Sequence, residues 1–341
     1  MRDKSKSNSR ELVYKTLEFN NTDRVPRQMW KLPWAENMYA LEVKKILEDY
    51  PNDIVRIQGY QKIDAQTYGN QFELGEFIDH WGCKFINRQR GIVGEVKEPL
   101  IKGENWEDKD ALRIPLELLE IDKEGINEFC RNTDKFVMAS ASPRIFERMQ
   151  FIRGTETLFI DLMLRPKGMY SVIEKIHDYY CRLLNEWAST DVDALSLTDD
   201  WGSQNSLLIN PELWEELFKP LYRDYIDIAH KHGKKIFMHS DGNILKILPH
   251  LIEIGLDAIN SQLFCMGIEK VAQFKGQITF WGEIDRQQLL PRGSQEEIEQ
   301  AVIKVKQHLW QNGGCIAQCE FGPGAKPENV YKVFETWNRL Q

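Results

Sequence analysis

The residues best suited to chemistry follow a short apolar segment near the middle of the C-terminal half. Residues 236–238 are too few for a helix and lead directly into His239, Ser240 and Asp241. Because side chains alternate along an extended backbone, His239 and Asp241 can share one side of a strand. A neutral imidazole beside a carboxylate is either a pair of metal ligands or an acid/base pair. The pattern leaves both interpretations open, together with a structural histidine that is held by a loop carboxylate.

A cysteine near the C-terminus is a candidate third ligand. Cys315 and Cys319 flank a short apolar run, and free cysteine is more often an inert core residue than a ligand. Cys319 differs because it lies at the expected end of a strand, where it could meet His239. Zinc bound by His239, Asp241 and Cys319 would keep one position open for substrate, and a thiol bound there would lose its proton. Glu283, at another expected strand end, is a possible fourth ligand or a catalytic group.

Further polar and aromatic residues follow expected strands. Asp199 and Asp200 are adjacent, and neighbouring carboxylates raise each other's pKa, which suits acid/base catalysis or a cationic partner. A turn or helix-capping aspartate is the alternative. Gln204 and Gln262 could donate hydrogen bonds to a ligand, and the ring of Trp201 suits a flat organic substrate. Each of these three side chains could equally be structural.

The elements that must position these residues alternate regularly over residues 133–341. Expected strands are separated by amphipathic helices, which indicates a parallel sheet. No strand leads into a glycine-rich nucleotide-binding turn, so a (β/α)8 barrel is favoured over an open doubly wound sheet. In such a barrel the carboxyl ends of the strands carry the chemistry. The expected strands are 136–141, 194–197, 235–238, 258–260, 278–281 and 315–318, and the longer helices include 170–187, 211–232, 244–254, 295–311 and 327–340.

Residues 1–132 are less regular and predict an N-terminal elaboration of the barrel. A helix is expected at 9–19, strands at 53–58 and 83–87, and a hairpin followed by an acidic loop at 91–114. No linker rich in Pro, Ser or Gly divides the chain, so residues 1–341 are expected to form a single domain.

The composition excludes several classes of protein. A net charge of -8 argues against a general nucleic-acid or anionic-membrane surface. The chain has no run of about 18 apolar residues to span a bilayer. Residues 1–10 lack the apolar centre of a secretory signal. Six cysteines without framework spacing indicate a reducing cytoplasm.

Several motifs occur in an order that resembles the uroporphyrinogen decarboxylase superfamily. The resemblance covers nearly the whole chain and implies a (β/α)8 barrel. The matching segments are Ser9-Arg10-Glu11, Asp23-Arg24-Val25-Pro26, Asp199-Asp200-Trp201-Gly202-Ser203-Gln204, His239-Ser240-Asp241-Gly242, Gly255-Leu256-Asp257-Ala258-Ile259-Asn260, Trp281-Gly282-Glu283-Ile284-Asp285 and Pro327-Glu328-Asn329-Val330.

The superfamily contains two chemistries, and this chain resembles one more than the other. True decarboxylases carry Arg-Gln-Ala-Gly-Arg after the opening proline, where this chain has Lys31-Leu32-Pro33-Trp34-Ala35 and lacks both arginines. The corrinoid-linked methyltransferases bind zinc through a His-x-Cys pair and a distant Cys. The resemblance implies that His239 and Cys319 are two of these ligands, with Asp241 in place of the middle cysteine. Because a carboxylate donates less charge than a thiolate, the substrate need not be a thiol.

These observations predict a cytoplasmic zinc-dependent methyltransferase that moves a methyl group between a small methylated substrate and a corrinoid carried by a partner protein. Asp199, Asp200 and Glu283 are the expected catalytic residues. Gln204, Gln262 and Trp201 are expected to bind substrate. Two alternatives stay open: a cofactor-free decarboxylase, and a non-catalytic corrinoid- or tetrapyrrole-binding protein. A homodimer is one assembly that the chain could form, and neither nucleic acid nor membrane is an expected partner.

Overall fold

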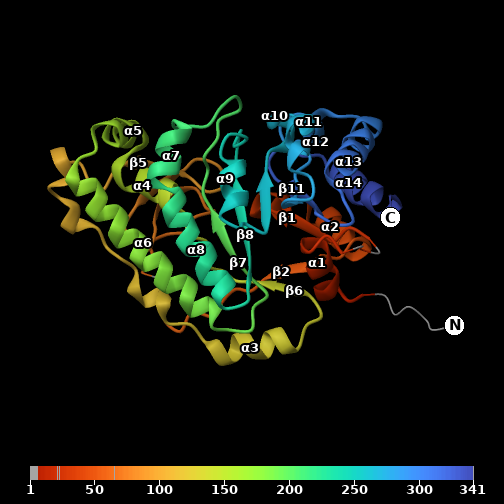
Figure 1. Cartoon of the computed structure of the whole chain (residues 1–341), viewed down its shortest axis with the longest axis horizontal. Helices are drawn as coiled ribbons and strands as arrows, with labels where there is room; N and C mark the ends of the chain where they lie inside the picture. The colour runs from red at the N-terminus through yellow and green to blue at the C-terminus, as the bar shows by residue number, and fades with distance from the viewer. Residues whose placement is uncertain (1–6, 21, 23, 65, 341) are drawn as a thin grey trace.

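The core of the protein is a barrel of eight parallel strands (Figure 1). The computed structural model describes residues 7–20, 22, 24–64 and 66–340, so residues 1–6 of the polar N-terminal segment and Asp23 of the opening motif lie outside the described residues. The strands are β1 (Arg27–Lys31), β2 (Ile54–Arg56), β6 (Phe136–Met138), β7 (Ala194–Thr198), β8 (Lys235–Ser240), β9 (Ala258–Ser261), β10 (Thr279–Trp281) and β11 (Cys315–Phe321).

The strand order almost closes the barrel. Hydrogen-bonded neighbours run β1-β11-β10-β9-β8-β7-β6-β2, and every neighbouring pair is parallel. Across the remaining seam, the Asp53 N–H donates to the Arg27 carbonyl at 2.8 Å, and the Asp53 carboxylate accepts from the Arg27 N–H at 2.8 Å. The predicted (β/α)8 barrel is therefore confirmed.

Alternation along the strands separates two apolar layers. One layer fills the barrel, and α1 (Ser9–Leu17) packs against it through Val13 and Leu17. The Arg10 N–H bonds to the Asp134 carbonyl and the Gly314 N–H to the Thr16 carbonyl, which places α1 at the amino ends of β6 and β11. That end of the barrel is closed, so the carboxyl end is left for a site. The interior residues are Ile54, Phe136, Met138, Ala194, Phe237, Ala258, Trp281 and Ile316.

The second apolar layer lies between the strands and the surrounding helices, which cover the barrel from outside (Figure 1). Proline shortens two of the predicted helices. Pro220 divides the predicted 211–232 helix into α7 (Pro211–Leu217) and α8 (Lys219–Lys231), because proline lacks the N–H that a helix interior requires. For the same reason Pro249 lies in the first turn of α9 (Leu248–Glu253), which begins later than expected. The helices are α2 (Pro33–Asp49), α3 (Lys123–Arg131), α4 (Ile145–Arg153), α5 (Thr155–Leu164), α6 (Lys167–Ala188), α7 (Pro211–Leu217), α8 (Lys219–Lys231), α9 (Leu248–Glu253), α10 (Leu263–Met266), α11 (Ile268–Val271), α12 (Leu289–Arg292), α13 (Gln295–Leu309) and α14 (Pro327–Arg339).

The N-terminal elaboration is a small antiparallel sheet inserted between β2 and β6. It consists of β3 (Gly75–Ile78), β4 (Lys84–Asn87) and β5 (Glu95–Glu98), followed by short 3-10 turns. The expected hairpin at 91–114 is thus one strand paired with β4, and the acidic stretch behind it forms the turns. Within the described part of the chain, no helix is long and apolar enough to cross a bilayer.

Candidate metal centre and active-site cavity

Three side chains with metal-binding atoms meet at the carboxyl ends of β7 and β8. Asp200 follows β7, His239 lies near the end of β8, and Asp241 follows it. The Nε2 atom of His239 lies 3.7 Å from Asp200 Oδ1 and 3.5 Å from Asp241 Oδ1. Among the described residues, these three form the one cluster of His, Cys, Asp or Glu with the spacing to hold a metal ion. His239 and Asp241 share one side of the strand, as their spacing suggested.

The ring of His239 is oriented by Asn260 on β9. His239 Nδ1 lies 2.6 Å from Asn260 Oδ1, and the Asn260 amide N–H donates to the Trp281 carbonyl, which fixes the amide with its oxygen toward the ring. Since that oxygen can only accept, Nδ1 carries the proton and Nε2 keeps its lone pair. A second polar group that sets the tautomer of a histidine is the usual arrangement behind a metal ligand.

One oxygen of Asp241 has no hydrogen-bond partner. Asp241 Oδ2 accepts from Arg286, whereas Oδ1 is buried and has no partner among the described residues. The Asp241 N–H donates to Asp200 Oδ1 at 2.8 Å and brings the two carboxylates together. A buried acceptor that faces a ring lone pair is costly unless a cation or a proton lies between them. Two ligand atoms that are each about 2.1 Å from a tetrahedral zinc ion lie about 3.4 Å apart, close to the spacing here.

Arg286 connects Asp241 to two glutamates. Its guanidinium donates to Asp241 and, at 2.8 Å, to Glu320, and its Nε lies 3.4 Å from Glu283 Oε1. Burial raises the pKa of Glu283 well above its usual value, and the charge of Arg286 opposes that rise. Glu283 is among the residues predicted from the sequence, whereas Arg286 and Asn260 are not. Both residues lie at or just after expected strand ends, and this position is the feature of the sequence that could have identified them.

The structure does not bring Cys319 to the metal cluster, and this expectation was wrong. Along β11, Ile316 faces the barrel interior, whereas Cys315, Ala317 and Cys319 belong to the layer between the strands and the helices. Cys319 pairs in register with Met29 of β1, which lies in the same outer layer. Burial and then the charges of Glu283 and Glu320 raise the pKa of the Cys319 thiol well above its usual value, so it stays protonated.

Asp199 and Trp201 are structural, which corrects their predicted catalytic and substrate-binding roles. Asp199 is fully buried and accepts from the N–H groups of Phe146 and Glu147, in the first turn of α4, and from the Tyr222 hydroxyl. Burial raises the pKa of Asp199 to about 7, and these hydrogen bonds oppose the rise. The buried Trp201 stacks on Phe146 with ring centroids 4.1 Å apart, so no surface is left for a substrate.

Gln204, Gln262 and Glu283 line one small pocket of about 160 Å³. The Gln204 amide donates to Gln287 at 2.6 Å and to Gln262 at 3.4 Å. Arg286 and Cys265 line the same pocket, so it lies on the β9–β10 side of the metal cluster. The structure thus gathers these predicted residues, and their binding of substrate stays a prediction.

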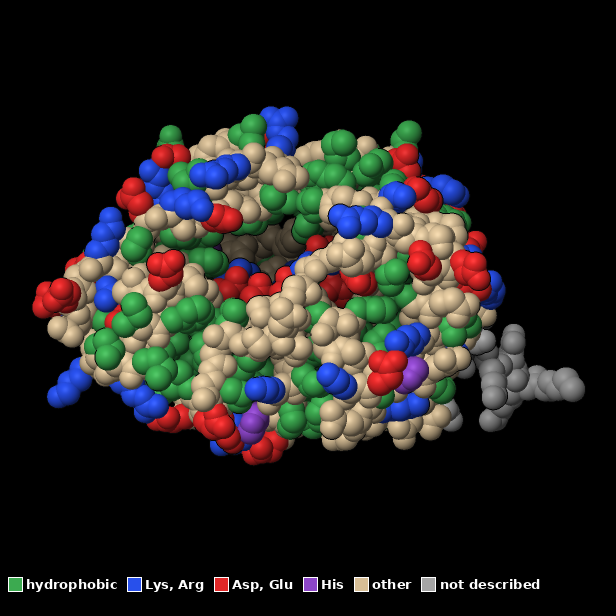
Figure 2. Space-filling view, turned by 90° about the horizontal axis from the view of Figure 1, so that it is seen from above, with side chains coloured by type: hydrophobic (Ala, Val, Ile, Leu, Met, Phe, Trp, Pro, Cys, Tyr) green, Lys and Arg blue, Asp and Glu red, His purple; other side chains and the backbone are tan. Residues whose placement is uncertain are grey.

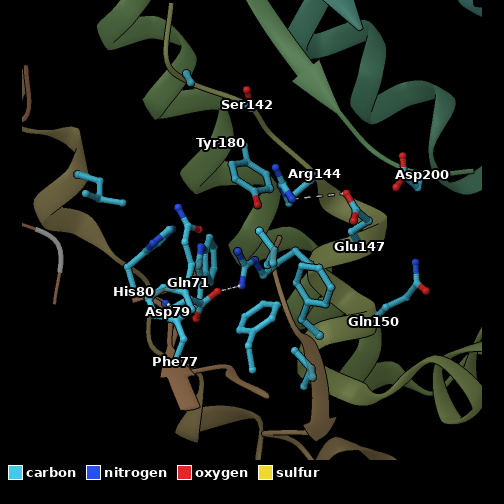
Figure 3. Close-up of a pocket in the computed structure, with 18 of the residues that line it drawn as sticks. Gln71, Phe77, Asp79, His80, Ser142, Arg144, Glu147, Gln150, Tyr180 and Asp200 are labelled. Carbon is cyan, nitrogen blue, oxygen red and sulfur yellow. Dashed lines mark hydrogen bonds and ion pairs between the residues drawn. The ribbon is translucent and has the colours of Figure 1, made fainter. Parts of the chain in front are cut away.

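A much larger cavity of about 1050 Å³ opens on the other side of the cluster (Figure 3). The N-terminal sheet, α4 and α6 form its walls, and Asp200 lies at its edge. From the side on which α10 and α12 lie, Figure 2 shows a hollow with acidic side chains along its rim. Aromatic rings supply much of the lining: Phe77, Trp81, Phe85, Phe151, Tyr179 and Tyr180.

In enzymes with this barrel fold the reaction takes place at the carboxyl ends of the strands, where the cluster of Asp200, His239 and Asp241 lies. The chain belongs to the uroporphyrinogen decarboxylase (URO-D) family, whose family model matches residues 120–340. No curated protein matches the sequence.

Solved structures support the fold. A methyltransferase from Methanosarcina mazei superposes with a TM-score of 0.69 at 12% identity, over 98% of this chain and 99% of that chain. A B12-independent methionine synthase from a Shewanella species gives a TM-score of 0.47 at 12% identity, over 89% of this chain and 86% of that chain. A xylanase from Gloeophyllum trabeum gives 0.44 at 10% identity, over 96% and 98%. The first of these shows a common fold, and the other two are too distant to carry an argument.

Proposed function

We propose that this protein is a zinc-dependent methyltransferase that moves a methyl group from a small methylated substrate to a corrinoid on a partner protein. The observation that carries the proposal is the convergence of His239 Nε2 with the carboxylates of Asp200 and Asp241. The name of the Methanosarcina mazei structure, a methyltransferase of the same fold, agrees with it.

The three side chains fit a zinc ion with open positions. A cation between Asp241 Oδ1, which is buried and without a partner, and the lone pair of His239 Nε2 would satisfy both atoms. A zinc ion bound there would act as a Lewis acid on the heteroatom that carries the methyl group. Asn260 keeps the imidazole in the required tautomer, and Arg286 holds Asp241 in place. With two carboxylates and no thiolate, the donor set suits an oxygen or nitrogen heteroatom better than sulfur.

The large cavity supplies space for the substrate beside the cluster. Its volume of about 1050 Å³ and its aromatic walls suit an organic molecule, and Asp200 connects it to the metal ligands. The open carboxyl end of the barrel offers the approach for the corrinoid, so the methyl group could pass in line between heteroatom and acceptor.

The charge of the cavity argues against a decarboxylase of tetrapyrrole acids. Five acidic residues line it, against two arginines, of which Arg148 is already paired with Asp79 at 2.5 Å. Only Arg144 of the two lining arginines has no hydrogen-bonded carboxylate, so the lining offers too few cations to bind a substrate with several carboxylates. The acidic lining residues are Asp64, Asp79, Glu95, Glu147 and Asp200.

Metal analysis tests the proposal most directly. Protein that is produced with zinc and dialysed is expected to hold about one zinc per chain, and His239→Ala is expected to lose it. Cys319→Ala is the matched control, because Cys319 lies in the outer layer and its loss leaves the cluster intact. Zinc retained by His239→Ala but lost by Cys319→Ala would contradict the proposed centre.

A transfer assay with reduced cobalamin as acceptor tests the reaction. Methylcobalamin is expected to form from methoxylated aromatic or methylamine donors with the wild type and Cys319→Ala, but not with His239→Ala. Release of carbon dioxide from uroporphyrinogen would instead favour the decarboxylase. Tight tetrapyrrole binding without turnover would favour the non-catalytic binding protein.

A further inference from the structure

Arg56, at the end of β2, carries a guanidinium with neutral partners only. It donates to the hydroxyl oxygens of Ser142 and Ser196 at 2.8 and 2.9 Å, and more weakly to the Ala139 carbonyl and the Met138 sulfur at 3.4 Å. No described carboxylate lies within ion-pair distance of it. A charge that is largely withdrawn from water is normally paired with an opposite charge, so Arg56 is an exception.

Arg144 is a second guanidinium without a hydrogen-bonded partner. It points into the large cavity close to Ser142 and Tyr180, and the dashed line in Figure 3 marks its long ion pair with Glu147. It donates no hydrogen bond to any residue that the structure describes. The nearest carboxylate oxygen, Glu147 Oε2, is 3.7 Å away. Burial raises the pKa of Glu147 to about 8, and the nearby Arg144 does not cancel that rise, so Glu147 is mostly neutral at pH 7.

The two guanidinium groups act on each other. Burial, and then the charge of Arg144, lowers the pKa of Arg56 to about 10. Arg148, in the same cavity, shows the contrast, because it is paired with Asp79 and lies over the ring of Trp81 at 4.9 Å. The structure therefore supplies a hydrogen-bonded anion for Arg148 but none for Arg56 and Arg144.

We propose that Arg56 and Arg144, with the Ser142 hydroxyl, form a subsite for the carboxylate of the substrate. Planar guanidinium groups bind a carboxylate through paired hydrogen bonds, and the carboxylate of Asp200 at the edge of the same cavity opposes an anion of higher charge. The aromatic walls favour a ring as the body of the substrate.

The substrate class that follows is a methoxylated aromatic monocarboxylic acid. Its carboxylate would bind on the β2–β6 side, and its methoxy oxygen would face Asp200, His239 and Asp241 across the mouth of the barrel. The identity of the methoxy group rests on the proposed methyl transfer, whereas the carboxylate subsite rests on the two arginines alone.

Calorimetric titration with the three methoxybenzoate isomers and the matching methoxybenzamides tests the subsite. At least one acid is expected to bind the wild type about tenfold more tightly than its neutral amide. Arg144→Gln is expected to remove most of that preference, and Arg144→Lys part of it, because lysine keeps the charge but not the planar fork. Arg165→Gln, which removes an exposed arginine paired with Glu216, is the control and should bind like the wild type.

The same titrations separate this inference from the metal. His239→Ala should keep the preference for the acid, since the arginines lie apart from the zinc ligands. The inference is overturned if no acid binds more tightly than its amide, or if Arg144→Gln leaves the preference unchanged. It is also overturned if inorganic phosphate at equal concentration displaces the acid as well as benzoate does. If the wild type holds no zinc but still prefers the acid to its amide, the methyltransferase proposal fails and the carboxylate subsite stands.

Discussion

The two sides of the barrel mouth carry opposite kinds of incomplete site. On the β8–β10 side, Asp241 Oδ1 and His239 Nε2 face each other with no positive charge between them. On the β2–β6 side, Arg56 and Arg144 lie near each other, and no carboxylate accepts a hydrogen bond from either. One side lacks a cation and the other side lacks an anion, and neither side supplies the charge that the other needs.

This difference suggests what the mouth is built to hold. A divalent cation would complete the first side, and the anionic end of an organic molecule would complete the second. The cavity of about 1050 Å³ reaches from Arg144 to Asp200, so one substrate could span both sides. The metal side would then act on the reacting atom, and the guanidinium side would set its position.

The largest expected effect distinguishes the two adjacent aspartates that follow β7. Asp199→Ala should lower the free energy of unfolding by about 3 kcal/mol, because two N–H groups of α4 and the Tyr222 hydroxyl would lose their buried acceptor. Asp200→Ala should change stability by less than about 0.5 kcal/mol but abolish zinc binding, since its half-exposed carboxylate belongs to the cluster.

Urea denaturation of the two variants with a chelator present measures stability without the contribution of bound metal. Metal analysis of folded protein without chelator measures the second effect. Equal loss of stability in the two variants, or full zinc content in Asp200→Ala, would mean that the adjacent carboxylates do not divide structure and metal binding in this way.

The barrel and two of the residues in the metal cluster could be predicted because they depend on the local pattern of apolar and polar residues in the sequence. Apolar runs separated by helices indicated the parallel strands, and residues after those runs had to gather at one end. His239 and Asp241 were found in this way. Cys319 was not placed correctly because β11 continues to Phe321, and the side of a strand on which a residue falls depends on alternation that reverses with every position.

Other parts of the site depend on contacts between distant segments. The sequence shows two aspartates at 199 and 200, but only the packing of α4 against β7 decides which one is buried. In the same way, only the three-dimensional surroundings of an arginine show whether it has an anionic partner. Arg56 and Arg144 are 88 positions apart, and nothing in their neighbours in the sequence shows that their charges meet.

A pH-dependent effect of intermediate size is expected on the guanidinium side. The pKa of Glu147 is about 8 in the folded protein, above the value of about 4.3 for an unfolded glutamate. The folded state therefore keeps a proton that the unfolded chain releases. This contribution to stability is complete below about pH 4 and is lost as the pH rises through 8.

Glu147→Gln should remove that dependence. Between pH 6 and 8, the free energy of unfolding of the wild type is expected to fall relative to Glu147→Gln by on the order of 2 kcal/mol. Urea titrations of the metal-free proteins at fixed ionic strength measure the difference. Glu95→Gln is the control, because Glu95 lines the same cavity but is fully exposed, and it should follow the wild type. A constant difference between wild type and Glu147→Gln would show that Glu147 is ionised throughout and pairs with Arg144.

The smallest expected effect concerns the minor pocket on the metal side. Gln204 is exposed, and its bonds to Gln262 and Gln287 exchange readily with water. If the substrate spans the larger cavity, Gln204 touches it at most at its edge. Gln204→Ala should then raise KM for the methyl donor by about threefold and leave kcat and zinc content unchanged, as expected for a contact of equal strength in ground and transition states. Steady-state kinetics with the wild type and the variant make the measurement. A fall in kcat of tenfold or more would place the reacting group beside Gln204, in the pocket of about 160 Å³, and the two sides of the mouth would no longer share one substrate.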